Sequence, residues 1–182
     1  MPSIDKIRAI HHPTRRRIID YLGVNGPAQV GALADALGQQ VGSISHHLRV
    51  LERQDVVARV PELAHDRRTS WWRLESSSIS WSVDDFATVV DRMTARAAQR
   101  ANIDHQLRKL AEWMRRADDS SQEWREAATS SDLGTVATAA ELKELGRRLL
   151  ETAAEWSSEI DRDDGQEREP VFLFLHAFPT RP

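Results

Sequence analysis

Apolar residues recur at helical spacing in the first third of the chain. Ile44, Leu48 and Leu51 stand at i, i+4 and i+7, which places them on one face of a helix. A second apolar face lies upstream, and Gly38 follows it as a helix stop signal. Its members are Val30, Leu33, Ala34 and Leu37. The pattern predicts two helices, the second at 40–54, joined by a short turn at 38–40.

The hydrophobic pattern changes after the second helix. Residues 56–60 and 69–74 are strand-like runs, and the segment between them is turn-prone and charged. The two runs predict a β-hairpin with residues 65–68 at its tip. Because neighbouring residues of a strand point in opposite directions, we expect Trp71 and Trp72 to divide between the core and the hairpin surface.

The polar residues of the second helix suit the major groove of DNA. Ser43, Ser45, His46 and Arg49 lie outside the apolar stripe. Short hydroxyl side chains allow the helix backbone to approach base edges, and Arg49 can pair with a phosphate or with a guanine. We therefore predict a recognition helix in which these four residues contact DNA. His47 lies nearer the buried stripe, and we expect it to pack there and support the helix.

The starts of both helices have unusual caps. Gln29 and Gln40 occupy the N-cap positions, where Ser, Thr, Asp or Asn is preferred. Phosphates suit the amides and dipole of such helix starts. We therefore include Gln29, Gln40 and Gly42 among the predicted DNA-binding residues. Val41 can touch a thymine methyl group or pack beside Ile44, and packing is the favoured interpretation.

The hairpin tip carries two further candidates. Arg67 and Arg68 follow His65 and Asp66. Exposed arginines on a loop are usually only solvated, but paired arginines at a hairpin tip suit phosphates or a narrow minor groove. Next to a recognition helix we favour DNA contact.

Residues 4–75 resemble the DNA-binding domain of ArsR-type winged-helix transcriptional regulators. The matching segments are HPTRRRIIDYL at 12–22, VGALADALG at 30–38 and SHHLRVL at 45–51. The resemblance implies a winged helix-turn-helix domain and a homodimeric repressor that a ligand releases from, or reshapes on, its operator. It extends more weakly into the C-terminal region.

Metal sensing is not expected. The chain has no cysteine, which excludes thiolate sensing of a soft metal. Asp104 and His105 are adjacent rather than on a shared ligand face, and the next histidine is His176. Zinc needs several convergent ligands with an orienting second shell, so no metal or other cofactor is predicted.

The charge of the chain divides unevenly between its two halves. Residues 1–75 carry 11 Lys and Arg against 8 Asp and Glu, whereas residues 76–182 carry 14 against 20. The net charge is +3 for residues 1–75 and −6 for residues 76–182, which predicts that the N-terminal region binds double-stranded DNA. Because phosphate contacts add through counterion release, a modest +3 favours binding as a dimer.

A long helix follows the serine-rich linker at 76–81. Its apolar positions keep a three–four spacing to about residue 116, with a slip near Arg100. They are Phe86, Val90, Met93, Ala97, Ile103, Leu107, Leu110 and Met114. A helix of about 30 residues is roughly 45 Å long, so a partner helix from a second subunit is the natural cover.

The last third predicts one more helix between two strands. Thr138 and Glu141 form a capping-box pattern ahead of an apolar face that continues to Ile160. Residues 133–137 and 171–178 look like strands, and the polar residues 161–169 form a loop. The run at 171–178 is apolar on both faces, so we expect it to be covered on both sides.

Six tryptophans raise the alternative of a hydrophobic effector site. Trp81, Trp113, Trp124 and Trp156 are candidates to line it, together with Phe86, Met93 and Phe172. Core and dimer packing is the favoured interpretation for each of them.

The fold prediction is mainly α with a β wing. A winged helix-turn-helix domain at 1–80 precedes an α/β dimerisation region at 81–182 that contains the long helix. An enzyme is not expected, because no phosphate loop or nucleophile elbow is present. No secretory signal or membrane span is expected, which favours the cytoplasm. The predicted function is a homodimeric repressor that reads a pseudo-palindromic operator. The alternatives are a winged-helix protein-interaction module and a regulator that responds to a hydrophobic small molecule.

Overall fold

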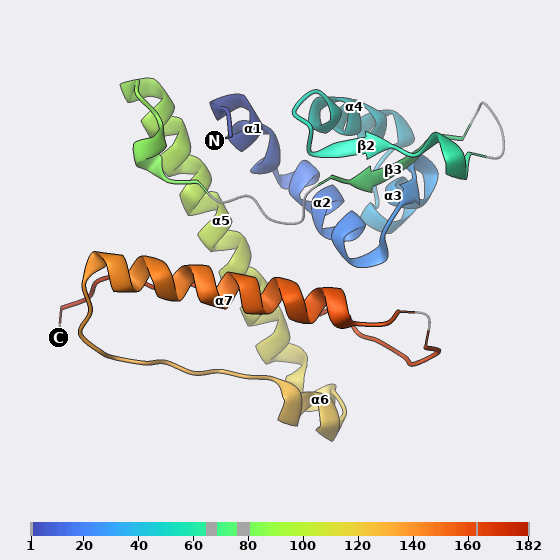
Figure 1. Ribbon diagram of the computed structural model, residues 1–182. Helices are drawn as coiled ribbons and strands as arrows, with labels where there is room; N and C mark the ends of the chain where they lie inside the picture. Colours follow the sequence, from blue (N-terminus) through green and yellow to red (C-terminus); the bar gives the residue numbers. More distant parts are fainter. Residues whose placement is uncertain (1, 65–68, 76–80, 163, 182) are drawn as a thin grey trace. The chain divides into compact units, whose positions relative to one another are not determined.

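The computed structural model describes residues 2–64, 69–75, 81–162 and 164–181 (Figure 1). The chain divides into two compact units, Met1–Arg108 and Lys109–Pro182. The predicted functional boundary at residue 80 stays a prediction.

The first unit begins with four helices. They are α1 (Ile4–Ile10), α2 (Pro13–Asn25), α3 (Val30–Leu37) and α4 (Val41–Glu52). The predicted pair of helices is confirmed as α3 and α4. α1 begins at a Ser3 cap, whose hydroxyl accepts a hydrogen bond from the Lys6 amide. Pro13 stands at the first position of α2, where its missing N–H and fixed φ suit a helix start.

A small antiparallel sheet follows the helices. Its strands are β1 (Ala28–Gln29), β2 (Val57–Arg59) and β3 (Trp71–Leu74), in the order β1-β3-β2. β2 and β3 confirm the predicted hairpin, and Arg59 stands opposite Trp72. The sequence did not indicate β1, which has only two residues. The short helix η1 (Pro61–Leu63) lies between β2 and β3, and the hairpin tip at 65–68 lies outside the described residues.

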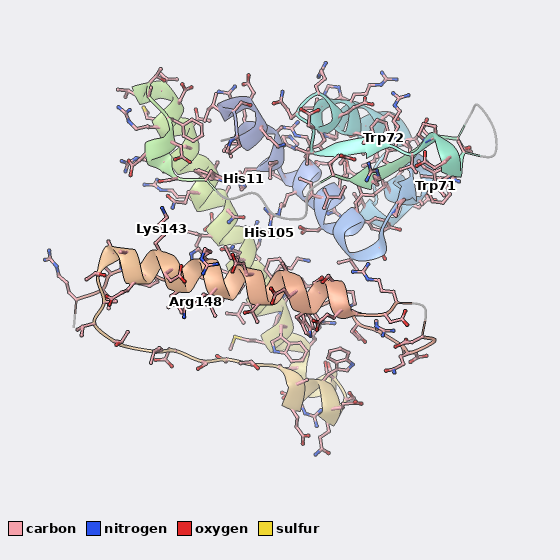
Figure 2. The ribbon with its side chains drawn as sticks, in the orientation of Figure 1. His11, Trp71, Trp72, His105, Lys143 and Arg148 are labelled. Carbon is pink, nitrogen blue, oxygen red and sulfur yellow. The ribbon has the colours of Figure 1, made fainter. Side chains whose placement is uncertain are left out.

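The core of the first unit joins all these elements. Figure 1 shows the strands with α2, α3 and α4 gathered around them. Trp72 is 3% exposed and packs in this core, whereas Trp71 is half-buried, as the alternation along the strand predicted (Figure 2). The fully buried aliphatic side chains are Ile18, Leu33, Ile44, Leu48, Leu51, Val56 and Val57. Their burial drives the fold of this unit.

The long helix α5 (Val89–Arg116) confirms the predicted helix. A short helix, η2 (Val83–Asp85), precedes it. Phe86, Ala95 and Ala98 are buried with Ile7 of α1 in a second cluster. The small alanine side chains allow α5 to approach α1 closely. Trp81 packs at the edge of this cluster, 6.4 Å from Phe86 between ring centroids.

A polar network also joins α5 to α2. Arg16 Nη1 donates to Asn102 Oδ1 at 3.1 Å, and His105 Nε2 lies 3.1 Å from Asp20 Oδ2. Asp20 also accepts from Arg16 Nε at 3.3 Å. His11 and His105 both lie where α5 passes the first helices (Figure 2). Within the first unit, α5 is therefore held to α1 and α2 by apolar and polar contacts together.

The second unit contains the end of α5 and two further helices. They are α6 (Gln122–Ala127), which a Ser121 cap begins, and α7 (Ala139–Glu159), with the short helix η3 (Ala117–Asp119) before α6. α7 confirms the predicted helix and its capping box: the Thr138 hydroxyl accepts from the Glu141 amide, and the Glu141 carboxylate accepts from the Thr138 amide.

The two strands predicted beside α7 are wrong. Residues 133–137 and 171–178 belong to no strand, and the described residues 109–162 and 164–181 contain none. Most of the run at 171–178 is exposed; the neighbours Val171 and Phe172 are 58% and 42% exposed. A strand needs a neighbouring edge for its hydrogen bonds, and an apolar sequence alone does not provide that edge. The C-terminal region is therefore helical with extended segments, not α/β.

Candidate nucleic-acid interface

The turn between α3 and α4 fixes the geometry of the site. Gly38 adopts a left-handed conformation with φ of 62°, which favours glycine, and its amide donates to the carbonyls of Ala34 and Asp35. The Gln39 amide donates to the Ala34 carbonyl at 2.9 Å. The chain then reverses into α4 at Gln40. A turn of three residues thus places α4 directly after α3, as predicted.

The buried face of α4 anchors it to the core. Ile44, Leu48 and Leu51 are each 0% exposed. The other faces carry the predicted DNA-contacting residues. Gln40, Gly42, His46 and Arg49 are exposed, and Ser43 and Ser45 are half-buried beside them. One helix therefore brings six of the nine predicted residues together.

The N-terminal turn of α4 is open. Val41 is 55% exposed, and its packing beside Ile44 stays a prediction. A Cβ added at Gly42 would meet no atom within 4 Å. Nothing inside the chain requires glycine at this position, and a ligand can approach the backbone closely here.

The helix starts of this region carry no side-chain caps. α2, α3 and α4 begin after His12, Gln29 and Gln40, and none of these side chains bonds to the first amides. Gln29 is half-buried, because it is also part of β1. The amides at the starts of α3 and α4 are therefore available to an external acceptor.

Histidines pack where α2 meets α4. The ring of His47 lies 4.8 Å from that of His12 and 5.4 Å from that of His46, between centroids. Burial, the neighbouring imidazole of His12 and the Arg15 guanidinium lower the pKa of His47. Burial first, then Arg15 and His46, lower the pKa of His12. His47 thus packs between the helices while His46 points outward.

The wing is tied to the end of α4. Arg59 of β2 lies over the Trp72 ring at 5.0 Å from its centroid. Its Nε donates to Glu52 Oε1 of α4 at 3.2 Å. The hairpin therefore holds a fixed position beside the helix at its base. Arg67 and Arg68 of its tip lie outside the described residues.

One candidate residue was missed. Arg53 caps α4 and is exposed, seven residues after His46 and four after Arg49. That spacing places it on the same side of the helix as both. Extending the polar stripe of the recognition helix by one turn would have found it from the sequence.

Asp104 and His105 take different positions on α5. Asp104 is exposed, whereas His105 is half-buried beside Asp20. Within the described parts of the chain, no group of three or more His, Cys, Asp or Glu residues could hold a metal ion. Likewise, no described helix is long and apolar enough to cross a membrane.

The comparison with family models agrees with this geometry. Residues 10–60 match the model described as "helix-turn-helix domain". The chain carries a helix-turn-helix domain. With the β2–β3 hairpin directly after α4, it is a winged helix-turn-helix domain, the fold of many DNA-binding transcriptional regulators. No curated protein matches the chain.

Several solved structures are similar to the chain. NolR from Sinorhizobium fredii is 30% identical over 40% of this chain and 67% of its own, with a TM-score of 0.34. The adhesin competence repressor from Streptococcus pyogenes is 17% identical over 80% and 81%, with a TM-score of 0.36. A MarR-family transcription regulator is 18% identical over 86% and 80%, with a TM-score of 0.35. The helix-turn-helix assignment depends on the family match and the geometry of residues 10–60.

Proposed function

We propose that the protein is a homodimeric transcriptional repressor of the ArsR type that reads a pseudo-palindromic operator in double-stranded DNA. The observation that carries the proposal is the outward face of α4. It presents His46 and Arg49 to solvent, with half-buried Ser45 beside them, while its opposite face is fully buried in a helix-turn-helix core.

Each residue has a role that follows from its position. Arg49 pairs with the O6 and N7 atoms of a guanine, and His46 with a neighbouring base edge. Ser43 and Ser45 contact bases or backbone at short range. The free amides after Gln29 and Gln40 take phosphates, and Gly42 lets the backbone approach them. Arg67 and Arg68 of the wing tip contact the flanking backbone or minor groove.

The exposed apolar face of α5 supports a dimer. Val90, Met93 and Met114 are 69%, 66% and 70% exposed, although they lie on the stripe that the helical spacing predicts. The face that α5 turns to its own chain is made of Ala95 and Ala98 instead. A second copy of α5 across a two-fold axis would cover the exposed stripe, and the two recognition helices would then read two related half-sites.

Operator binding tests the proposal. The operator is first identified by mapping where the protein binds in the genome. The dissociation constants of the wild type, Arg49→Ala and His46→Ala are then measured on the operator and on random DNA. A good bidentate contact discriminates by about 1–3 kcal/mol, so we expect Arg49→Ala to lose about 5- to 150-fold on the operator and less on random DNA.

The control variant is Arg162→Ala, which removes an exposed arginine in the loop after α7. It should bind both DNAs like the wild type. Equal affinity of the wild type for operator and random DNA would contradict the regulator and favour a protein-interaction module.

The dimer has its own test. Met93→Glu places a charge on the exposed stripe of α5 and leaves the core unchanged. Sedimentation equilibrium should show a dimer for the wild type and a monomer for Met93→Glu. A wild type that stays monomeric at micromolar concentration contradicts the dimer.

A further inference from the structure

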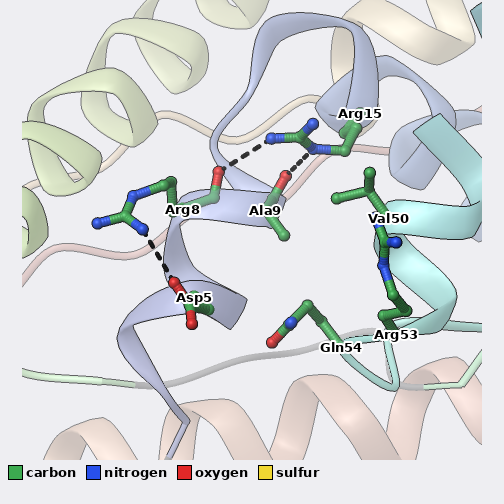
Figure 3. Close-up of a pocket in the computed structure, with 7 residues that line it drawn as sticks. All are labelled: Asp5, Arg8, Ala9, Arg15, Val50, Arg53 and Gln54. Carbon is green, nitrogen blue, oxygen red and sulfur yellow. Dashed lines mark hydrogen bonds and ion pairs between the residues drawn. The ribbon is translucent and has the colours of Figure 1, made fainter. Parts of the chain in front are cut away.

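A pocket lies between α1 and the C-terminal end of α4 (Figure 3). It has a volume of about 200 Å³ and is open to solvent. Its lining residues are Asp5, Arg8, Ala9, Arg15, Val50, Arg53 and Gln54. Three guanidinium groups and a primary amide against one carboxylate make its lining suited to an anion.

The three arginines are engaged to different degrees. Arg8 Nη1 donates to Asp5 Oδ1 at 2.9 Å, and Figure 3 shows this side chain turned toward Asp5. Arg15 donates from Nε to the Ala9 carbonyl at 2.6 Å and from Nη2 to the Arg8 carbonyl at 3.3 Å. Within the described residues, the Arg53 guanidinium has no hydrogen-bond or ion-pair partner.

The pocket therefore combines a fixed cation with a free one. Two carbonyls at the end of α1 use two of the five donors of Arg15 and hold its guanidinium at the wall. Arg53 keeps all five donors. A planar guanidinium matches two oxygens of a phosphate, which makes arginine the preferred residue for binding it.

The position of Arg53 on α4 links the pocket to DNA. It follows Arg49 by four residues, which corresponds to about 6 Å along the helix axis. The major groove is about 12 Å wide, so half its width is also about 6 Å. A helix that holds Arg49 at the base edges and tilts across the groove brings Arg53 to the phosphates at the groove wall.

We infer that this pocket binds a backbone phosphate of the operator, with Arg53 as the principal donor and Arg15 as the second. The inference rests on the proposed function. It adds α1, the turn after it and the end of α4 to the DNA-binding surface. Such a contact carries no sequence information, but it fixes the register of the recognition helix on the duplex.

Salt-dependent DNA binding tests the inference. Arg53→Gln removes the free cation, and Gln54→Glu adds a carboxylate of almost unchanged shape beside it. Each should lower the affinity for operator and random DNA by the same factor, about tenfold at low salt. For Arg53→Gln, the slope of log K against log salt should fall by about one. Arg53→Lys should keep most of the slope.

Arg162→Gln serves as the matched control, since it removes the same charge from an exposed site in the second unit. It should leave the slope unchanged. Circular dichroism of each variant separates loss of binding from loss of folding. If folded Arg53→Gln still binds its operator with an unchanged salt slope, the phosphate contact in the pocket is overturned, but the proposed transcriptional regulator is not. A loss of affinity for the operator alone would show that Arg53 contacts bases, and it would overturn the phosphate contact as well.

The source of the phosphate is tested separately. Inorganic phosphate is titrated into the free protein and followed by amide chemical shifts. No saturable shift below about 1 mM is expected, because one free ion lacks the neighbouring contacts that a duplex provides. Submillimolar binding that Arg53→Gln abolishes would assign the pocket to a free phosphate compound and overturn the DNA contact.

Discussion

α4 and α7 have the same kind of sequence pattern but different surroundings. In α4 the apolar stripe of Ile44, Leu48 and Leu51 is 0% exposed. In α7 the corresponding residues Leu145 and Leu149 are each 40% exposed, and Trp156 is 53% exposed. Helical spacing therefore specifies which face of a helix is apolar, but it does not say whether the same chain covers that face.

The difference separates the roles of the two units. The first unit buries the apolar stripe of α4 in its core and leaves the polar face of that helix outside. The second unit leaves apolar side chains exposed on α7 and on residues 171–178. We propose that the first unit reads DNA and that the exposed helical faces serve association.

Core truncation should show the largest difference between the two helices. Leu48→Ala leaves a cavity in a closed core and should cost about 2–5 kcal/mol of unfolding free energy, whereas Leu149→Ala should cost less than about 1 kcal/mol in the monomer. Urea unfolding measures both. A cost for Leu149→Ala that grows with protein concentration would show that a second copy covers α7. Equal costs at all concentrations would contradict the distinction.

The pH dependence of stability tests the packing of His11 near α5 within the first unit. Burial first, then Arg16 and His105, lower the pKa of His11 from 6.5 to about 4. Between these values the unfolded chain binds more protons than the folded one. The free energy of unfolding is therefore unaffected by His11 above pH 6.5 and decreases as the pH falls from 6.5 toward 4.

His11→Gln should flatten this dependence. His11 is partly exposed, so after solvent screening we expect its share to be about 1–2 kcal/mol. Urea unfolding of both proteins across this pH range measures it. Parallel curves of unfolding free energy against pH for the two proteins would show that the pKa of His11 does not differ between the folded and unfolded states.

The cap of α7 tests whether this helix forms independently of a cover. Thr138→Ala removes both the hydroxyl acceptor for the Glu141 amide and the Thr138 side chain that contacts the Glu141 carboxylate. The loss should be about 1 kcal/mol and should lower the helix content of the second unit without affecting DNA affinity. Ser3→Ala, at the capped start of α1, is the matched change in the first unit. An unchanged circular dichroism spectrum for Thr138→Ala would mean that packing alone holds α7.

Substitution of Gly42 should have the smallest effect on stability of these changes, together with a clear effect on DNA binding. Its added Cβ meets nothing in the chain, so Gly42→Ala should raise the stability of α4 by about 0.5–1 kcal/mol through helix propensity. The same methyl group should weaken DNA binding where the backbone approaches phosphate. Gly146→Ala, in α7, should stabilise without changing DNA affinity. Unchanged DNA affinity of Gly42→Ala would remove this residue from the interface.

Much of the first unit could be predicted because its signals are local. The i, i+4, i+7 stripe of α4, the Gly38 stop and the strand alternation at Trp72 each depend on a few neighbouring residues. β1 could not be predicted, since two residues carry no periodic signal and its hydrogen bonds come from β3. The assignment of Arg15 to a pocket wall also required the fold, because its partners are the carbonyls of α1.

The prediction for the second unit failed where partners were needed. Residues 171–178 have a strand-like composition, yet no strand in the described residues pairs with them. The prediction of helix α7 was correct, and its capping box was confirmed by the Thr138–Glu141 hydrogen bonds.

The sequence by itself determined the helices, their apolar faces, the turn at 38–40 and the polar face of α4, because these follow from side-chain spacing and backbone preference within about ten residues. The tertiary structure decided which apolar faces are buried, that Ala95 and Ala98 rather than Met93 pack α5 against α1, and that Arg15 and Arg53 border one pocket. Burial and convergence depend on contacts between segments distant in the sequence, and no local pattern encodes those contacts.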